Sequence, residues 1–330
     1  MSDLRPSTPV RTALTDLAAR FAATVLTAGG EEASAGAVEV TGLSLSSQRV
    51  EPGDLYAALP GARVHGAAYA ADACARGAVA VITDAAGLEL LGRDDSGVAA
   101  TTPVLLVEEP RTILGRLAAE VYGRPSAALR MIGVTGTQGK TTTTLLAEGG
   151  LRRAGLRAAV IGTVGTRIDG HDVKTSLTTP EAPDLHGLFA VMREREVEVC
   201  AMEVSSHALV MGRVDGVVFD VAVFLNLGRD HLDFHPTVED YYQAKASLFT
   251  PERTRLGLVN LDDEHGRRLA AEAPVPVRTF ALDPARGADW SVTDVVATAE
   301  GSDLVVIGPD GVRIPDRKST RLNSSHRCIS

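Results

Sequence analysis

The 330-residue sequence has few cysteines and no long hydrophobic runs, and both absences narrow its class. No apolar run approaches the roughly 20 residues that a membrane-spanning helix needs. The N-terminus lacks the apolar segment of a signal peptide, so we expect neither a membrane span nor secretion. The three cysteines lack the spacing of metal or disulfide sites, which favours the reducing cytoplasm; they are Cys74, Cys200 and Cys328.

Positive charge is also scarce. The net charge of −9 argues against a general affinity for nucleic acid, so a phosphorylated ligand would have to be held by local basic and backbone groups. Arginine fills most basic positions, and lysine occurs only at Lys140, Lys174, Lys245 and Lys318. Because arginine cannot replace a compact ammonium or a reactive amine, each retained lysine is a candidate for function.

Length and the order of the elements predict two α/β domains. Apolar residues make up 45% and charged residues 23% of the chain, as in ordinary globular proteins. Residues 1–125 are predicted to form a small α/β domain that has no phosphate loop of its own. Residues 126–316 are predicted to form a doubly wound domain, in which ligands bind beyond the carboxyl ends of the strands.

The predicted elements follow from hydrophobic periodicity and turn residues. A first amphipathic helix should carry Leu14, Leu17, Phe21 and Val25 and end near residues 29–30. We predict central strands over residues 129–134, 158–161, 197–204, 220–225, 256–260 and 275–281, and helices over 141–154, 180–195, 238–249 and 263–273. Residues 290–314 should form antiparallel strands with turns at 301–302 and 309–311.

The stretch 131–146 is the strongest signal in the chain. An apolar strand runs into glycine-spaced residues, a Lys-Thr pair and an apolar helix start, which is the order that a nucleotide phosphate site requires. Lys140 should reach the β- and γ-phosphates, and the Thr141 hydroxyl should bind Mg²⁺. A glycine-rich turn before an ordinary helix is the alternative. The predicted ATP contacts are Gly136, Thr137, Gly139, Lys140, Thr141, Thr142 and Asn260.

Three further motifs follow predicted strands or lie on a helix. Glu203 ends an apolar strand and could serve the Mg²⁺ of a nucleotide, although a solvated strand-end glutamate is the alternative. Residues 226–235 combine Asp and His densely enough for a cation site or phosphate contacts, although a lone histidine would be structural. Lys245 lies on a helix, where a snorkelling surface lysine is the alternative.

Taken together, these motifs resemble the Mur ligase family, and within it the MurE type, which adds the third residue of the peptidoglycan stem peptide. The resemblance covers about residues 38–315. It rests on the motifs at residues 133–143, 177–181, 202–209, 229–235 and 241–249, and on the N-terminal segments 50–61 and 76–81.

The resemblance implies an ATP-dependent amide ligase. The γ-phosphate would go to the D-Glu carboxylate of UDP-N-acetylmuramoyl-L-Ala-D-Glu, and the amine of a diamino acid would then attack the acyl phosphate. It also implies that Glu203 and His231 help to hold Mg²⁺ and that Lys245 is carbamylated and acts as an extra carboxylate. Catalytic roles fall to Lys140, Lys245 and His231. The implied substrate contacts are Leu45, Ser47, Thr178, Thr179, Ser205 and Arg213.

Other properties are also expectations at this point. Diaminopimelate is favoured over lysine as the added residue, and we expect a monomer in the cytoplasm with no nucleic-acid or membrane partner. The loop at Ser46, Ser47 and Gln48 departs from the Asp-Ser-Arg of many relatives, which weakens the expectation for the UDP contacts there. Mur ligases carry a C-terminal Rossmann-like domain, and the resemblance stops before one.

We interpret residues 317–330 as an artefact of frame or cloning, with a genuine disordered tail as the alternative. The 330-residue chain is therefore expected not to complete the ligation alone. Other hypotheses remain: the ligase that adds D-Ala-D-Ala, a folylpolyglutamate synthase, or a non-catalytic nucleotide-binding remnant. A P-loop NTPase switch is disfavoured because the sequence shows no switch or effector segments.

Overall fold

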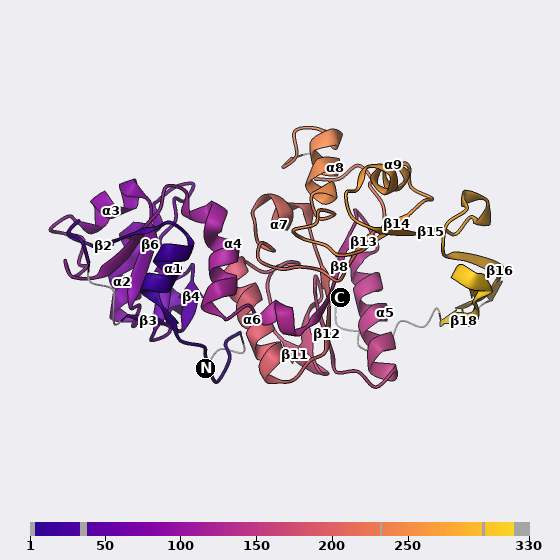
Figure 1. The fold of residues 1–330 in the computed structure, drawn as a ribbon, viewed down its shortest axis with the longest axis horizontal. Coiled ribbons are helices and arrows are strands. Elements are labelled where there is room, and N and C mark those ends of the chain that lie inside the picture. Colours follow the sequence, from indigo (N-terminus) through magenta and orange to yellow (C-terminus); the bar gives the residue numbers. More distant parts are fainter. Residues whose placement is uncertain (1–3, 34–37, 232, 299–300, 320–330) are drawn as a thin grey trace. The chain divides into compact units, whose positions relative to one another are not determined.

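The computed structural model describes residues 4–33, 38–231, 233–298 and 301–319. The chain forms two compact units. The first comprises Met1–Val134 and Thr141–Asp220, and the second comprises Thr135–Lys140 and Val221–Ser330. The α/β fold class is as predicted (Figure 1), whereas the two units have other bounds than the predicted domains 1–125 and 126–316.

The first unit begins with a five-stranded sheet whose strand order is β2-β7-β6-β5-β4. Strand β2 pairs antiparallel with β7, and the other neighbours are parallel. Apolar side chains of the sheet and its helices form two buried clusters, which include Leu14, Leu55 and Leu117 in one and Tyr56 and Val81 in the other. The strands are β2 (Thr24–Thr27), β4 (Gly42–Ser44), β5 (Asp54–Ala57), β6 (Ala80–Thr83) and β7 (Pro103–Leu106), and the helices are α1 (Leu14–Arg20), α2 (Ala70–Ala75), α3 (Ala85–Leu91) and α4 (Pro110–Val121).

The rest of the first unit carries a second group of strands, in which β9, β12 and β8 are parallel neighbours. A hairpin extends this group antiparallel through β10 and β11. Glu203 at the end of β12 is in register with Val134 of β8, so both strands end at the same edge. The elements are β8 (Arg130–Thr135), β9 (Ala158–Gly162), β10 (Gly165–Ile168), β11 (His171–Val173), β12 (Val199–Glu203), α5 (Lys140–Arg153), α6 (Ala182–Glu194) and α7 (Ser206–Val210).

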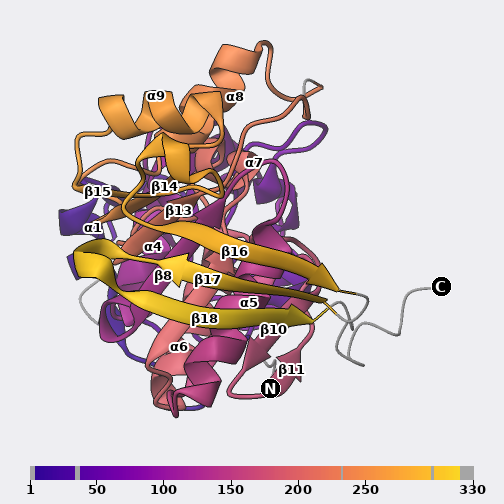
Figure 2. The ribbon, with the colours of Figure 1, turned by 90° about the vertical axis from the view of Figure 1, so that its right-hand side faces the viewer.

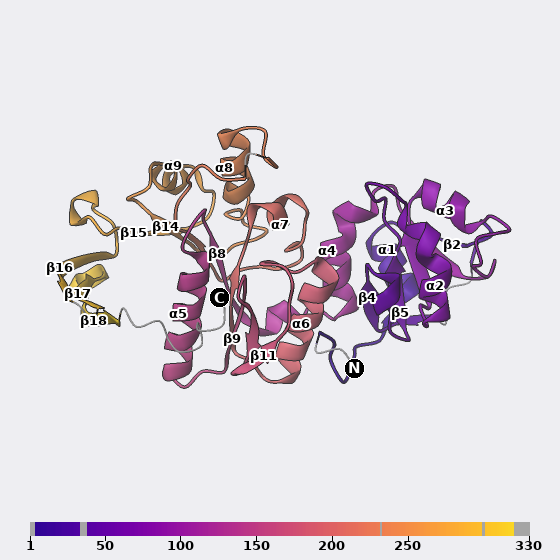
Figure 3. The ribbon, with the colours of Figure 1, turned by 180° about the vertical axis from the view of Figure 1, so that it is seen from behind.

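The second unit has three parallel strands in the order β13-β14-β15 and a separate antiparallel sheet in the order β16-β17-β18. Figure 2 shows the antiparallel sheet from its flat side, and Figure 3 shows α8 and α9 beside the parallel strands. The elements are β13 (Val221–Phe224), β14 (Gly257–Asn260), β15 (Val277–Phe280), α8 (Val238–Ala246), α9 (Glu264–Glu272), β16 (Ser291–Thr298), β17 (Gly301–Ile307) and β18 (Arg313–Ser319).

Short elements complete the chain. A two-residue pairing joins β1 (Thr12–Ala13) to β3 (Glu39–Val40). Short 3₁₀ helices occupy Ser47–Arg49, Gly66–Tyr69, Pro125–Ala128, Pro284–Arg286 and Pro309–Gly311. Within the described residues, no helix is long and apolar enough to span a membrane.

Several element predictions were wrong. The first helix ends at Arg20, and Val25 lies in β2, because the segment Thr24–Thr27, three of whose four residues are β-branched, pairs with β7. The turn expected at residues 301–302 is instead the start of β17. The hairpin β10–β11 and the helices α3 and α7 were not predicted. Strand β18 includes the first three residues of the segment 317–330, and residues 320–330 lie outside the described part of the chain.

Candidate functional site

The glycine loop between β8 and α5 has the backbone that its sequence predicts. Gly136 and Gly139 adopt φ angles of +153° and +86°, which only glycine adopts readily. A Cβ atom at Gly136 would lie 2.9 Å from Cβ of Leu225. The loop therefore needs glycine at Gly136 both for its backbone conformation and for its contact with the segment after β13.

The side chain of Asn226 holds this loop in place. Its Oδ1 accepts hydrogen bonds from the backbone N–H groups of Thr137 and Gln138 at 3.1 and 3.0 Å, and its Nδ2 donates to the carbonyl of Gln138 at 3.1 Å. The Thr137 hydroxyl accepts a further bond from the Gly228 N–H at 2.8 Å. Asn226 lies in the predicted 226–235 cluster, but no separate role was predicted for it. A carboxamide directly after a strand is able to pair with both the N–H and the C=O groups of a neighbouring backbone.

Lys140 begins α5 and turns back over the loop. Its Nζ donates to the carbonyl oxygens of Gly136 at 2.8 Å and Thr137 at 3.1 Å. Thr141 and Thr142 follow in the first turn of this 14-residue helix. An ammonium group, a glycine loop and a helix N-terminus together form a positive cradle of the kind that binds phosphate groups. These residues fit the triphosphate of ATP.

Lys245 is buried, with 1% of its surface exposed, which excludes a lysine that snorkels to solvent. Its Nζ donates to the Gly136 carbonyl at 3.1 Å and lies 4.5 Å from the ring centroid of Tyr241. Burial, and then the nearby charge of Lys140, lower the pKa of Lys245 to about 7. Two basic side chains of the second unit thus converge on one carbonyl of the phosphate loop.

The histidines of the 226–235 cluster lie near the same tyrosine. The His235 ring is 4.9 Å and the His231 ring 6.0 Å from the ring of Tyr241, measured between centroids. His235 is buried, whereas the His231 side chain is 42% exposed and its residue has a positive φ of +53°. Leu232, within the cluster, lies outside the described residues.

Asn260, predicted as an ATP contact, joins the ends of two strands. Its Nδ2 donates to the carbonyl of Leu225 at 2.9 Å, and its Oδ1 accepts from the Asp262 N–H at 3.0 Å. Next to it, Asp263 caps α9 and accepts the N–H of Leu227 at 3.1 Å. The Asn260 amide thus bonds to backbone groups, and its role toward ATP stays a prediction.

In the first unit, Glu203 is buried at the end of β12, with 1% exposed, so it is not a solvated strand-end glutamate. Its two carboxylate oxygens accept hydrogen bonds from the Thr163 N–H at 2.8 Å and the Thr163 hydroxyl at 3.1 Å. A Cβ atom at Gly162 would lie 2.2 Å from Oε1 of Glu203. The carboxylate is therefore held by neutral donors against a glycine.

Four of the expected substrate contacts are linked by hydrogen bonds to Thr163 or to the backbone of Glu203, directly or through Thr179. The Thr178 hydroxyl is 3.0 Å from that of Thr163, and the Thr179 hydroxyl donates to the Glu203 carbonyl at 2.8 Å. Ser205 caps α7, and its N–H donates to the Thr179 hydroxyl at 3.2 Å. Arg213 donates to the Thr179 carbonyl at 3.3 Å and forms an ion pair of 2.8 Å with Glu181.

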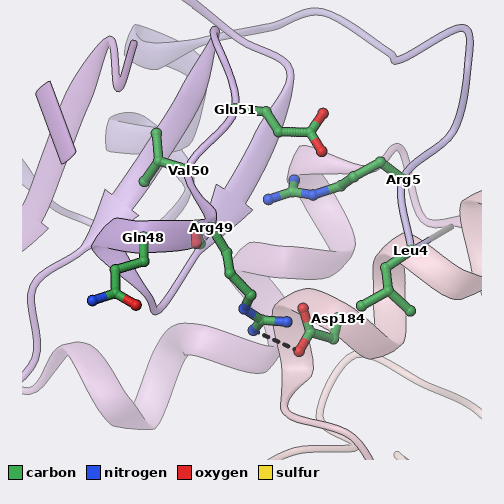
Figure 4. A pocket seen from close by; sticks show the side chains of 8 residues that line it. Leu4, Arg5, Gln48, Arg49, Val50, Glu51 and Asp184 are labelled. Carbon is green, nitrogen blue, oxygen red and sulfur yellow. Dashed lines mark hydrogen bonds and ion pairs between the residues drawn. The ribbon is translucent and has the colours of Figure 1, made fainter. Parts of the chain in front are cut away.

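The other two expected substrate contacts, Leu45 and Ser47, lie in the turn after β4 and in the 3₁₀ helix that follows it. Beside this turn is a pocket of about 240 Å³, shown in Figure 4. Arg49 reaches across it to Asp184 at 2.9 Å, and Arg5 pairs with Asp54 at 2.8 Å. The lining residues are Leu4, Arg5, Ser44, Gln48, Arg49, Val50, Glu51 and Asp184.

No group of three or more His, Cys, Asp or Glu side chains in the described residues is arranged to hold a metal ion. Mg²⁺ usually binds to one or two carboxylates and to substrate phosphates, and keeps several waters. A single buried carboxylate such as Glu203, with the Thr141 hydroxyl, fits an ion that arrives with a nucleotide. Of the residues expected to bind the metal, Thr141 and Glu203 belong to the first unit, and His231 and Lys245 to the second.

Comparison with known proteins agrees with the phosphate loop and the motifs around it. Residues 134–319 match the Mur ligase middle domain, and residues 39–122 match the catalytic domain of the Mur ligase family. The chain belongs to the Mur ligase family. The family resemblance expected from the sequence is thus confirmed.

The similar relatives are of the MurE type. The UDP-N-acetylmuramoyl-L-alanyl-D-glutamate--2,6-diaminopimelate ligase of Streptomyces coelicolor is 52% identical over 309 residues, which cover 94% of this chain and 59% of the relative. The ligase of the same name from Corynebacterium glutamicum is 47% identical over 267 residues, which cover 80% of this chain and 50% of the relative.

A solved structure of a ligase with this name superposes with a TM-score of 0.68 at 29% identity, and the match covers 84% of this chain and 55% of that one. The chain therefore spans between 50% and 59% of the length of these three relatives.

Proposed function

We propose that this chain is the nucleotide- and substrate-binding part of an ATP-dependent ligase of peptidoglycan precursor synthesis. The ligase adds meso-diaminopimelate to UDP-N-acetylmuramoyl-L-Ala-D-Glu. The observation that carries the proposal is the 52% identity to a ligase of that name over 94% of this chain. The preformed phosphate loop under Lys140 supports it independently, because such a cradle suits the phosphates of ATP.

The proposed roles fall to the loop that follows β8 and to Glu203 at the end of β12. Lys140 and the loop from Gly136 to Gly139 bind and orient the phosphates, and Asn226 keeps the loop N–H groups in place. Phosphoryl transfer needs positioning and charge neutralisation more than covalent help from the protein. Mg²⁺, when bound, would neutralise phosphate charge, and Glu203 with the Thr141 hydroxyl would hold it.

Lys245 is proposed to carry the carbamate, as the family resemblance implies, with His231 as a further metal contact. Support comes from the position of the amine, which is buried against the Gly136 carbonyl and an aromatic ring. Arginine, which dominates the basic positions of this chain, could not accept a carboxyl group in this way.

The substrate end is proposed to involve Leu45, Ser47, Thr178, Thr179, Ser205 and Arg213. Residues 1–125 would form the UDP-binding domain and residues 126–316 the ATP-binding domain, and the protein would work in the cytoplasm as a monomer. Because the relatives are longer, we propose that ligation also requires the part that this chain does not match. The 330-residue polypeptide then binds substrate and ATP without amino-acid-dependent release of phosphate.

The test is a thermal-shift titration of the 330-residue chain. UDP-N-acetylmuramoyl-L-Ala-D-Glu at a hundred times its Kd should stabilise the folded chain by about 2.7 kcal/mol. UDP-N-acetylmuramoyl-L-Ala, which lacks the D-Glu carboxylate, should stabilise it less. Arg213→Gln should weaken this protection, and Arg157→Gln is the matched control, because Arg157 is a half-exposed arginine paired with Glu196.

Each alternative has its own outcome in this titration. Protection by the diaminopimelate-containing tripeptide substrate instead of the dipeptide substrate would favour the ligase that adds D-Ala-D-Ala. Protection by a folate substrate would favour a folylpolyglutamate synthase. Binding of ATP without protection by any UDP-sugar peptide would leave a nucleotide-binding remnant. Amino-acid-dependent phosphate release by this chain would contradict the proposed need for further sequence.

A further inference from the structure

Tyr241 on α8 contacts two groups of the proposed ATP site, the Thr137 hydroxyl and the Lys245 amine. Its side chain is buried, with 1% exposed. Its hydroxyl lies 3.1 Å from the hydroxyl of Thr137 in the phosphate loop, which already accepts the N–H of Gly228. The hydroxyl is therefore available to fix the Thr137 side chain and, through it, the loop.

The ring of the same residue supports Lys245. The Lys245 Nζ lies 4.5 Å from the ring centroid, so the ring packs against the free amine that is proposed to accept the carboxyl group. This amine also donates a hydrogen bond to the Gly136 carbonyl at 3.1 Å. No ion pair joins Lys245 to a carboxylate within the described residues, so the ring and one loop carbonyl set the position of the amine.

The ring itself has little freedom to move. His235, which is also buried, packs against it with centroids 4.9 Å apart and planes tilted by 38°. A buried ring with a hydrogen-bonded tip and a packed face occupies a single rotamer. Its two ends meet consecutive loop residues, Gly136 through Lys245 and Thr137 directly.

We propose that Tyr241 is a positioning residue that fixes the phosphate loop and the Lys245 amine relative to each other. Its hydroxyl holds Thr137, and its ring holds Lys245. This inference rests on the proposed function and assigns a role to the first residue of the motif 241–249, for which no role was predicted from the sequence. Tyr241 does not act on the nucleotide itself but fixes two groups that do.

The adjacent tyrosine provides a matched control. Tyr242 is equally buried on the same helix, with its hydroxyl 3.0 Å from Glu272 and the Arg268 guanidinium 4.2 Å from its ring centroid. It has the same chemistry, a hydrogen-bonded phenol under a cation, but none of these contacts is to the phosphate loop. Tyr242→Phe therefore reports the structural cost of losing a buried phenol hydroxyl on α8.

The test compares Tyr241→Phe, Tyr241→Leu and Tyr242→Phe in the full chain by NMR and by ADP titration with Mg²⁺. Tyr241→Phe should shift the backbone amide signals of Thr137 and Gly228, retain the ring-current shift of the Lys245 ε-methylene, and weaken ADP binding about fivefold, the effect of one hydrogen bond. Tyr241→Leu should also abolish the ring-current shift. Tyr242→Phe should leave the loop signals, the Lys245 signal and ADP affinity unchanged.

Unchanged Thr137 and Gly228 signals in Tyr241→Phe, or equal losses of affinity in Tyr241→Phe and Tyr242→Phe, would overturn the positioning role. Absence of ADP binding by the wild-type chain would instead count against the proposed function. The amide and ring-current signals do not need a nucleotide, so they decide the role of Tyr241 in either case.

Discussion

Two buried glutamates of the first unit differ in the groups that contact their carboxylates. Glu148 on α5 is 2% exposed, and the Arg167 guanidinium grips it with bonds of 2.9 and 3.2 Å, while Arg152 adds a contact of 3.5 Å. Glu203 is 1% exposed, yet its carboxylate accepts hydrogen bonds from the backbone amide and the hydroxyl of Thr163. Within the described residues, no ion pair reaches Glu203.

The difference separates a structural carboxylate from one suited to a ligand. A buried carboxylate is stable as an ion when a cation or several hydrogen bonds compensate the loss of water. Glu148 has its cations built in and joins α5 to β10. Among the described residues, Glu203 accepts hydrogen bonds from neutral donors only. These donors orient the carboxylate without pairing it with a cation, as the proposed Mg²⁺ role requires.

The largest expected effect is on the structural carboxylate. Arg167→Met should lower the free energy of unfolding by about 3 kcal/mol, because it leaves the Glu148 carboxylate buried with only its weaker partner. Arg152→Met is the control and should cost less than about 1 kcal/mol, since Arg152 is 45% exposed. Urea unfolding measures both variants. Equal effects of the two variants, or loss of nucleotide binding in folded Arg167→Met, would undo the distinction.

A buried histidine gives the next effect, through pH. His186 on α6 is buried, its Nε2 donates to the Asp215 carbonyl at 3.1 Å, and burial lowers its pKa to about 4. The unfolded chain takes up the proton near pH 6.5, so stability is full above pH 6.5 and falls as pH drops toward 4.

The contribution of His186 to this loss should reach about 2 kcal/mol at pH 5. His186→Gln keeps a donor for the carbonyl but cannot titrate, and it should flatten the pH dependence measured by urea unfolding. An identical pH profile in wild type and variant would show that His186 is not the group responsible.

The smallest expected effect is that of a substitution at Glu203, which tests its proposed role in holding Mg²⁺. Glu203→Gln should weaken ATP binding in the presence of Mg²⁺ about tenfold, equivalent to about 1.4 kcal/mol, and change the free energy of unfolding little. Without Mg²⁺, wild type and variant should bind ATP with similar affinity. Calorimetry with and without the ion makes the measurement, and an equal Mg²⁺ effect in both proteins would remove Glu203 from the metal site.

The sequence predicted the regular parts of the fold and the residues that come in dense motifs. The parallel strands and their helices were found because apolar periodicity and turn residues agree there. The hairpin β10–β11 was missed because its strands are only four and three residues long and β11 is largely polar. Val25 was assigned to a helix because its spacing from Leu14, Leu17 and Phe21 fits one, while pairing with β7 decides for a strand.

The candidate site shows the same limit. Lys140 and Glu203 were found because their positions after apolar strands carry the chemistry. The burial of Lys245, the clamp of Asn226 on the loop and the contacts of Tyr241 depend on which segments meet after folding, and spacing along the chain does not report this. The arginine bias, the position after the 226–235 cluster and the resemblance to the family motif marked Lys245 in advance.

The loop under Lys140 is proposed to bind the phosphates of ATP. The most direct test is calorimetric titration of ATP and Mg²⁺ into the wild-type chain and into Lys140→Met, with urea unfolding of both to show that the fold is retained. The wild type should bind ATP saturably, and the variant should bind it at least a hundredfold more weakly, a difference of about 2.7 kcal/mol. Equal affinity of two folded proteins, or no binding by the folded wild type, would contradict it.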